Sequence, residues 1–275
     1  MIIDPTQVVR ADIRAMQAYP VQHAAGLVKL DAMENPHRLP QWLRKEIADL
    51  IQGAEINRYP DPVATSLKQR LREVMAVPAG SELILGNGSD EIISMMINAV
   101  TGSDSVIMSV SPTFAMFKMS ATIARAKYVG VPLEPDFSLD ADRVIAAMRE
   151  YQPAILFIAY PNNPTGNLFD EESIRRLLEN APGLVVIDEA YHVFARRTFM
   201  PQLDQYPNLV VMRTLSKLGL AGLRLGYAAG RPELISEVDK VRGPYNVGVL
   251  TQTIAEKILQ NHQILEEQAD EIVAE

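Results

Sequence analysis

The stretch Leu184-Val185-Val186-Ile187-Asp188-Glu189-Ala190-Tyr191 decides the fold, because it joins an uninterrupted apolar run to two acidic residues. Consecutive branched aliphatic residues are typical of a strand covered on both faces, since a half-exposed strand alternates apolar and polar side chains. An aspartate that ends such a strand is costly unless it meets a cation, a metal or several donors. The stretch therefore predicts an interior strand that delivers the Asp188 carboxylate to a site. A capping or salt-bridged aspartate is the alternative.

Apolar runs of the same kind recur along the chain and alternate with amphipathic stretches of helical period. We expect seven strands, at Glu82–Leu85, Ser105–Val110, Ala126–Val131, Ala154–Ala159, Leu184–Ile187, Leu209–Arg213 and Leu225–Ala229. We expect helices at Asp90–Ala99, Phe114–Ala124, Ala141–Tyr151, Glu171–Asn180 and Glu233–Val241, with N-caps at Asp140 and Asp170. This alternation predicts an α/β fold: a doubly wound, mainly parallel seven-stranded sheet with helices on both faces.

The composition excludes several classes of protein. The chain has 275 residues, a formal net charge of −8 and no cysteine. It shows no basic stripe, so we expect neither a nucleic-acid nor a membrane partner, and disulfides and thiolate chemistry are excluded. The uncharged stretch Tyr151–Phe169 is interrupted by prolines and cannot form a continuous spanning helix. The start, Met1-Ile2-Ile3-Asp4-Pro5, is unlike a signal peptide, which leads us to expect a cytoplasmic protein.

The two ends of the chain read differently from its centre. The first 80 residues are rich in proline around two helical patterns, Trp42–Gln52 and Thr65–Val74, and predict an arm and a connecting layer. The segment 242–246 breaks the chain, and Val249–Glu275 then predicts one long helix. The chain stops inside that pattern without a capping signal.

Polar residues follow four of the expected strands, at the edge of the sheet where open α/β proteins bind ligands. Gly86-Asn87-Gly88-Ser89-Asp90-Glu91 opens a helix and is a candidate phosphate cradle, or else an ordinary capped turn. Tyr160-Pro161-Asn162-Asn163-Pro164-Thr165-Gly166 forms a rigid turn that aims an amide away from its strand, unless it is simply a loop. Asp188 is the third of these features.

The fourth strand end carries Thr214-Leu215-Ser216-Lys217, with Arg224 seven residues after the lysine. A lysine among small and apolar residues can lose its proton and act as an amine nucleophile, although a solvated loop lysine is the commoner case. The neighbouring hydroxyls and the arginine can bind a phosphate. No histidine, aspartate or glutamate cluster has metal-ligand spacing, so we expect no metal.

Together the four strand ends supply a phosphate site, an amide, a carboxylate and an amine. Pyridoxal 5′-phosphate requires this combination, because its aldehyde needs a lysine and its ring nitrogen needs a carboxylate. Three motifs in order resemble the fold-type-I, class-II aminotransferases that use this cofactor: Asn163-Pro164-Thr165-Gly166, Asp188-Glu189-Ala190-Tyr191, and Ser216-Lys217 followed by Gly222-Leu223-Arg224-Leu225-Gly226. Within them the chain most resembles the histidinol-phosphate aminotransferase family, through Asn57-Arg58-Tyr59-Pro60-Asp61, residues 86–91 and Pro112-Thr113-Phe114.

The resemblance implies roles around the cofactor ring. Lys217 would bond to the cofactor's aldehyde carbon, and Asp188 would pair with the ring nitrogen. Asn163 and Tyr191 would hydrogen-bond the phenolic oxygen. Phe114 would stack on the ring, at a position that is more often tyrosine in the family, so stacking is kept and a hydroxyl is lost.

The resemblance also implies a phosphate site and a dimer. Main-chain amides of Ser89 and Asp90, the hydroxyls of Thr214 and Ser216, and the Arg224 guanidinium would hold the cofactor's phosphate. In a homodimer, Tyr59 would reach the phosphate of the neighbouring subunit, and Tyr19 would line the substrate pocket.

The same resemblance gives a domain division and two departures. We expect an N-terminal arm over residues 1–30, a cofactor-binding large domain over 31–245, and the incomplete start of a small C-terminal domain over 246–275. The family's arginine for the substrate anion is expected in that small domain, so no residue here is given the role, and the chain reads as a truncated copy. At the substrate entrance the family's Leu-Asn-x-Asn-Glu-x-Pro reads as Leu30-Asp31-Ala32-Met33-Glu34-Asn35-Pro36, which loses a polar contact.

The implied activity is ping-pong transamination from histidinol phosphate to 2-oxoglutarate in histidine biosynthesis. Three alternatives stay open. The first is another amino-acid aminotransferase or a threonine-phosphate-type decarboxylase of the same fold. The second is a protein that binds the cofactor but is inactive and serves interaction or regulation. The third is that the chain is a truncated copy of a full enzyme.

Overall fold

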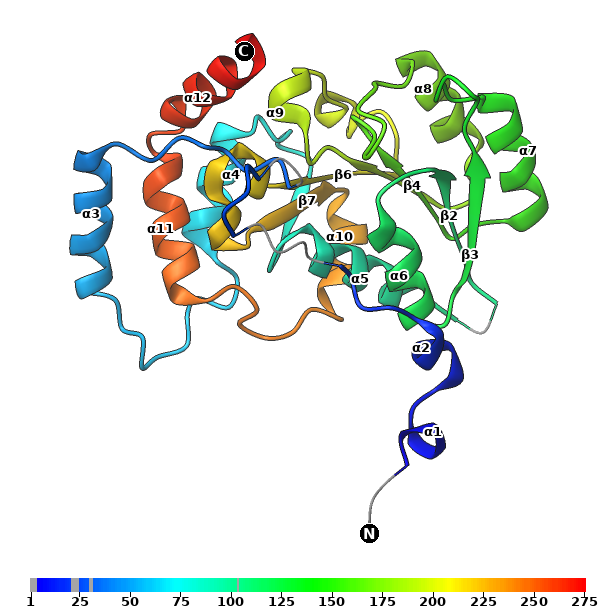
Figure 1. Ribbon diagram of the computed structural model, residues 1–275, viewed down its shortest axis with the longest axis horizontal. Coiled ribbons are helices and arrows are strands. Elements are labelled where there is room, and N and C mark those ends of the chain that lie inside the picture. The colour runs from blue at the N-terminus through cyan, green and yellow to red at the C-terminus, as the bar shows by residue number, and fades with distance from the viewer. Residues whose placement is uncertain (1–3, 21–24, 30–31, 103) are drawn as a thin grey trace.

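A seven-stranded sheet forms the centre of the protein (Figure 1). The computed structural model describes residues 4–20, 25–29, 32–102 and 104–275. The strands lie in the order β1-β7-β6-β5-β4-β2-β3, and only the pairings of β7 with β1 and with β6 are antiparallel. Their bounds are β1 Glu82–Gly86, β2 Val106–Ser111, β3 Lys127–Pro132, β4 Ile155–Ala159, β5 Leu184–Asp188, β6 Leu209–Thr214 and β7 Gly226–Gly230. The seven strands and the mainly parallel sheet that the sequence predicts are confirmed.

Each interior strand contributes side chains to two separate cores, which explains the continuous apolar runs. In β4, Leu156 and Ile158 join one core, whereas Ile155 and Phe157 join the other. The helices α4 (Thr65–Val74), α7 (Ala141–Tyr151), α8 (Glu171–Asn180) and α11 (Val249–Leu259) contribute to the first core. The helices α5 (Ser89–Val100), α6 (Ala115–Ile123) and α10 (Pro232–Asp239) contribute to the second. The sheet is therefore covered on both faces.

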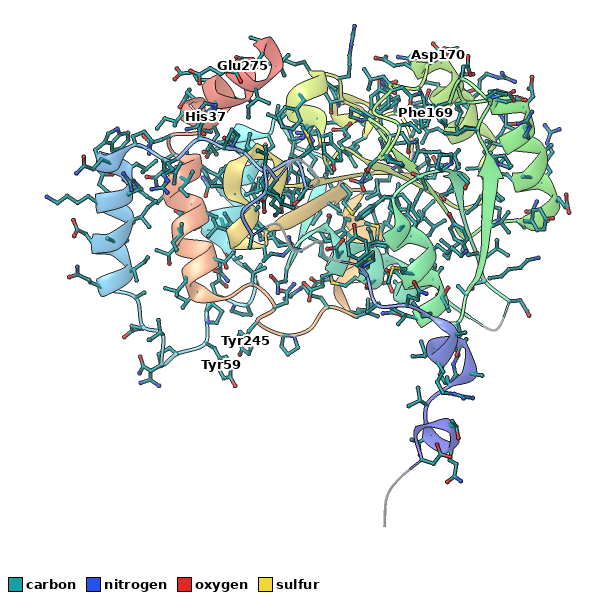
Figure 2. All side chains as sticks on the ribbon, viewed as in Figure 1. His37, Tyr59, Phe169, Asp170, Tyr245 and Glu275 are labelled. Carbon is teal, nitrogen blue, oxygen red and sulfur yellow. The ribbon has the colours of Figure 1, made fainter. Side chains whose placement is uncertain are left out.

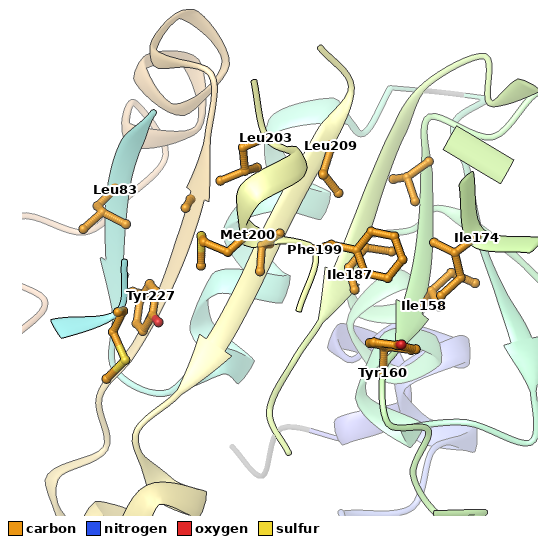
Figure 3. Close-up of a cluster of buried hydrophobic side chains, with 14 of the residues drawn as sticks. Leu83, Ile158, Tyr160, Ile174, Ile187, Phe199, Met200, Leu203, Leu209 and Tyr227 are labelled. Atoms are coloured by element: carbon orange, nitrogen blue, oxygen red, sulfur yellow. The ribbon is translucent and has the colours of Figure 1, made fainter. Parts of the chain in front are cut away.

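Figure 3 shows part of the first core, where side chains from several strands meet the segment 199–203. Tyr160 and Phe199 pack edge to face with their ring centroids 5.3 Å apart. Burying one such large apolar side chain stabilises the fold by roughly 1.5–3 kcal/mol. The core thereby fixes the strand ends from which the polar residues follow.

Two helix starts have the caps that the sequence predicts. The side chain of Asp140 accepts a hydrogen bond from the main-chain N–H of Arg143 at 3.0 Å, ahead of α7. The side chain of Asp170 accepts one from the main-chain N–H of Ser173 at 2.8 Å, ahead of α8. Each bond satisfies a main-chain donor that the helix leaves unpaired.

The prediction of one long C-terminal helix is wrong. The chain forms α11 and then α12 (Gln263–Ala274), with a break at residues 260–262. At the break, the N–H of Asn261 donates to the Ile258 carbonyl, which is an i−3 bond and tightens the last turn of α11. The redirected α12 packs against α9 (His192–Ala195) and the turn Ser216–Leu220. Burial of Leu265 and Ala269 in α12 outweighs the local helical pattern.

The N-terminal region lies around the sheet rather than in it. The sequence did not predict the helices α1 (Pro5–Val8) and α2 (Ala11–Ala15). Helix α1 extends away from the body of the molecule, whereas α2 contacts α6 (Figure 1). Helix α3 (Gln41–Gln52) packs beside α11, far from it in sequence (Figure 1). Among the described residues, no helix has both the length and the apolar character that a membrane crossing demands.

Candidate active site

A cavity of about 590 Å³ lies at one edge of the sheet, where β4, β5 and β6 end. Strand β1 runs in the same direction as β6, because two antiparallel pairings through β7 separate them. The loops after β1, β2, β4, β5 and β6 therefore converge on this edge. Eleven of the twelve residues that the sequence predicts line the cavity, namely Tyr19, Ser89, Asp90, Phe114, Asn163, Asp188, Tyr191, Thr214, Ser216, Lys217 and Arg224.

Asp188 is the last residue of β5 and is buried. Its Oδ1 accepts a hydrogen bond from the main-chain N–H of Ala190 at 3.1 Å. Burial raises the pKa of Asp188 to about 7, and the charges of Asp90 and Glu189 add to the rise, whereas the Ala190 bond opposes it. A buried carboxyl with so little compensation is suited to pairing with a cation in the cavity.

Lys217 is half-buried on a turn of π-helical hydrogen bonding, Ser216–Leu220, directly after β6. Its ammonium donates to the main-chain carbonyl of Ala32 and lies 5.5 Å from the ring centre of Tyr191. Burial lowers the pKa of Lys217; the charge of Glu34 opposes this effect and that of Arg224 adds to it. A lysine with a lowered pKa is a better amine nucleophile at neutral pH.

The cradle next to Lys217 has the donors of an anion site. Helix α5 begins at Ser89, so its first main-chain N–H groups and its dipole favour a negative charge. The Thr214 and Ser216 hydroxyls lie 2.9 Å apart, and Arg224 approaches Ser216 Oγ at 3.5 Å and Asp90 Oδ2 at 3.2 Å. Gly88 has a φ of +85°, and a Cβ there would lie 2.6 Å from Arg224 Nη2. Glycine at 88 therefore leaves the room that the cradle needs.

Aromatic side chains lie on two sides of the cavity. Phe114 precedes α6 and packs edge to face on Phe117, with ring centroids 5.7 Å apart. Tyr191 precedes α9, and burial together with the nearby Asp188 raises the pKa of its hydroxyl. Tyr19, about half exposed, reaches the cavity from the N-terminal arm.

Tyr59 is the predicted residue that the cavity does not include. Its side chain is 80% exposed and stacks on Tyr245, with ring centroids 4.3 Å apart and planes 15° from parallel. Figure 2 shows both rings at one edge of the molecule, pointing out of it. This position matches the expectation that Tyr59 acts on a neighbouring subunit, which stays a prediction.

The structure also shows residues that the sequence reasoning missed. Lys29 of the arm, Ala32 shortly after the arm and Met116 of α6 line the cavity. The arm has no periodic pattern that could have pointed to them, and Leu30 and Asp31 of the substrate-entrance motif lie outside the described residues. A second miss is the buried pair of Glu189 and Arg213, in which Glu189 Oε2 accepts from Arg213 Nη2 at 2.8 Å and from its Nε at 2.9 Å. The alternation of side chains along a strand could have separated Glu189 from the site, because it places Glu189 on the face of the sheet opposite Asp188.

Comparisons with known proteins agree with this arrangement. The chain is 51% identical to histidinol-phosphate aminotransferase 2 of Cupriavidus pinatubonensis, over 100% of this chain and 77% of the relative. It is also 51% identical to histidinol-phosphate aminotransferase 1 of Ralstonia nicotianae, over 98% of this chain and 73% of the relative.

The fold resembles a solved structure as well. The histidinol-phosphate aminotransferase of Sinorhizobium meliloti, solved in complex with pyridoxal-5′-phosphate, matches with a TM-score of 0.84 at 22% identity. The match covers 97% of this chain and 75% of that one, and it supports the fold alone. The family model described as aminotransferase class I and II matches residues 25–275. With so much of its length matched, the chain belongs to the class I and II aminotransferase family.

Proposed function

We propose that the protein is a pyridoxal-phosphate-dependent aminotransferase that transfers the amino group of histidinol phosphate to 2-oxoglutarate, giving imidazole acetol phosphate and glutamate in histidine biosynthesis. One observation carries the chemistry: Lys217 and Asp188 line the same cavity, beside an anion cradle. The relatives at 51% identity support the choice of substrate.

The residues of the cavity fit the cofactor. A buried carboxyl with a raised pKa, Asp188, suits a protonated ring nitrogen, which would return the carboxyl to its charged form. The helix start at Ser89, two hydroxyls and Arg224 suit a phosphate. Bound there, the cofactor supplies a conjugated ring that takes up the electrons left when a proton leaves the substrate's carbon.

The chain's own residues orient the reactants and move the proton. Lys217 supplies a neutral amine from its half-buried position, and its Nζ takes and returns the proton at the substrate's carbon. Asp188 would keep the ring nitrogen of the bound cofactor protonated. Asn163 and Tyr191 would donate to its phenolic oxygen, and Phe114 would cover a ring face.

The proposal extends to organisation and partners. Residues 1–30 form an arm, 31–245 the cofactor-binding domain, and 246–275 the start of a small C-terminal domain. The protein acts in the cytoplasm as a homodimer on small amino donors and 2-oxo acids. Tyr59 of each subunit then reaches the phosphate site of the other, which is consistent with its exposed, stacked position.

The test is the variant Lys217→Ala, with Lys240→Ala as the matched control. Lys240 is exposed and pairs with Glu237 one turn earlier, so its loss leaves the cavity intact. We expect Lys217→Ala to lose the visible absorbance of the lysine-bound cofactor and all measurable transamination, while the control keeps both. Turnover by Lys217→Ala would refute the assignment.

Assays with different substrates distinguish the proposed activity from the alternative functions. The wild-type protein is assayed with histidinol phosphate and 2-oxoglutarate, against aromatic donors and with carbon dioxide detection. Faster turnover of aromatic donors would point to a general aminotransferase, and carbon dioxide release to a decarboxylase. A yellow protein whose spectrum no amine changes would be a cofactor-binding protein without this activity.

A further inference from the structure

Two loops that carry cavity residues are joined beneath the cavity by one buried side chain. Phe114 follows β2, and Asn163 follows β4, which is the neighbouring parallel strand. Both residues line the cavity, whereas Asn162, which directly precedes Asn163, does not. Asn162 is 2% exposed. Its amide therefore acts on the two loops from within the protein.

The Asn162 side-chain amide forms hydrogen bonds with both loops. Its Nδ2 donates to the carbonyl of Pro112 at 3.0 Å and to the hydroxyl of Thr165 at 2.7 Å. Its Oδ1 accepts from the hydroxyl of Thr113 at 2.7 Å. Pro112 and Thr113 directly precede Phe114, and Thr165 belongs to the turn of Asn163. An amide is the side chain that supplies two donors and an acceptor at one point.

Further hydrogen bonds fix the turn in which Asn162 lies. The Thr165 hydroxyl donates to Asn167 Oδ1 at 2.5 Å, and Asn167 Nδ2 donates to the Phe137 carbonyl at 3.0 Å. In the main chain, the N–H of Asn162 donates to the Asn167 carbonyl at 3.0 Å, and that of Gly166 donates to the Asn162 carbonyl at 2.8 Å. These bonds join Asn162 to the rest of its turn and hold the turn to a third loop, at Phe137.

We propose that Asn162 is a positioning residue that sets the place of the Phe114 ring relative to the Asn163 amide across the cofactor site. The inference rests on the proposed function, because that function supplies the cofactor that Phe114 and Asn163 would contact. Asn163 is the next residue along the chain, and Phe114 follows Thr113 directly, so neither can shift without straining the bonds of Asn162. A cofactor ring held between Phe114 and Asn163 would depend on the spacing of these two residues.

The discriminating variant is Asn162→Asp, which keeps the shape of the side chain. It loses both donated bonds and sets a carboxyl oxygen against the Pro112 carbonyl, whereas Thr113 can still donate. We expect the dissociation constant of pyridoxamine 5′-phosphate, measured by titration calorimetry, to rise roughly tenfold, which corresponds to about 1.4 kcal/mol. We also expect a shifted pH midpoint of the visible absorbance of the lysine-bound cofactor, because under the proposed function Asn163 would hydrogen-bond the phenolic oxygen.

Asn208→Asp is the matched control. Asn208 Nδ2 also donates to two main-chain carbonyls, those of Leu178 at 2.9 Å and Gly183 at 3.5 Å. It lies just before β6, at the opposite edge of the sheet from the cavity. We expect this variant to lower the stability of the protein without changing the ligand affinity or the pH midpoint.

A second variant covers poor folding of the first. Thr113→Val removes only the hydroxyl that donates to Asn162 Oδ1, and we expect a smaller loss of affinity in the same direction. Unchanged affinity and pH midpoint in both Asn162→Asp and Thr113→Val, or equal changes in Asn208→Asp, would overturn the inference. Failure of the wild-type protein to bind the ligand would instead count against the proposed function.

Discussion

The position of Asp188 at the end of a buried strand determines the protonation of its carboxyl. Because β5 is covered on both faces, its last side chain is removed from water while its main chain stays in the sheet. The carboxyl has one main-chain donor and two acidic neighbours, Asp90 and Glu189, so its protonated form is favoured. In the cofactor-free protein this preference has a cost in stability that depends on pH.

The variant Asp188→Asn measures that cost. The pKa is about 7 in the folded protein and near 3.8 in the unfolded chain, so the folded state binds the extra proton between these values. The stability contributed by this group is therefore present below pH 4 and is lost as the pH rises towards 7, by about 4 kcal/mol in all. Asparagine keeps the acceptor for Ala190 and does not titrate. We expect the free energy of unfolding of cofactor-free Asp188→Asn, relative to wild type, to increase from pH 5 to pH 8 in urea titrations. A difference that stays constant with pH would contradict the assignment.

Residue-level prediction from sequence succeeded where a strand end gives the position. Asp188, Thr214 and the turn of Asn163 follow apolar runs, and parallel strands bring their ends to one edge. The segment before the first helix of the body follows no such rule. The contact of Lys217 with the Ala32 carbonyl joins residues 185 positions apart, and no local pattern encodes it. Asn162 belongs to the turn 160–166 that the sequence predicts, but its burial, and hence its proposed role, depends on the neighbouring loop.

At the scale of elements, β7 and α5 meet so closely that a methyl group would separate them. A Cβ on Gly226, the first residue of β7, would lie 2.6 Å from the main-chain nitrogen of Ser89 and 2.8 Å from the Gly88 carbonyl carbon. These are main-chain atoms at the start of α5, so they cannot rotate away. The spacing of the anion cradle is thus set by a glycine on a different element.

We expect Gly226→Ala to displace the start of α5 and weaken cofactor binding by about tenfold or more, a loss of at least ~1.4 kcal/mol. The measurement is titration of the cofactor-free protein with pyridoxamine 5′-phosphate, which needs no bond to Lys217. Gly222→Ala is the control, because a Cβ there has no atom within 4 Å among the described residues. Equal affinities for the two variants would show that the close approach has no effect on the cradle.

The elements themselves were predictable to the extent that local pattern decides them. The strands and the caps Asp140 and Asp170 are confirmed. Both depend on neighbouring residues: a strand buried on both faces is a continuous apolar run, and a cap directly precedes its helix. The sequence does not predict the break between α11 and α12; after it, Leu265 packs into the core, a contact between distant segments that local pattern does not encode. The turn at Ser216–Leu220 was also missed; it accommodates Gly219 at a φ of +118°, which ordinary helical periodicity does not reveal.

At the scale of the whole molecule, the exposed apolar residues around Tyr59 form the surface that the proposed homodimer would use. Tyr59 is 80% exposed, and Ile56 and Val63 in the same connecting segment are 73% and 53% exposed. Tyr245, from the loop before α11, stacks on Tyr59 and extends this surface (Figure 2). Apolar side chains gathered in this way are typical of interaction sites.

In the proposed homodimer, the contact between subunits and the cofactor site would be coupled, which gives a prediction that depends on protein concentration. If Tyr59 reaches the phosphate site of the partner, dimerisation and cofactor binding strengthen each other by the same factor. We expect wild-type protein to sediment as a dimer and to bind pyridoxamine 5′-phosphate more weakly when diluted into monomers. Tyr59→Ser should weaken both dimerisation and binding, whereas Val273→Ser, at an exposed site on α12, should change neither. Cofactor affinity that is independent of protein concentration would separate Tyr59 from the site, because a residue supplied by a partner can act only when the partner is present.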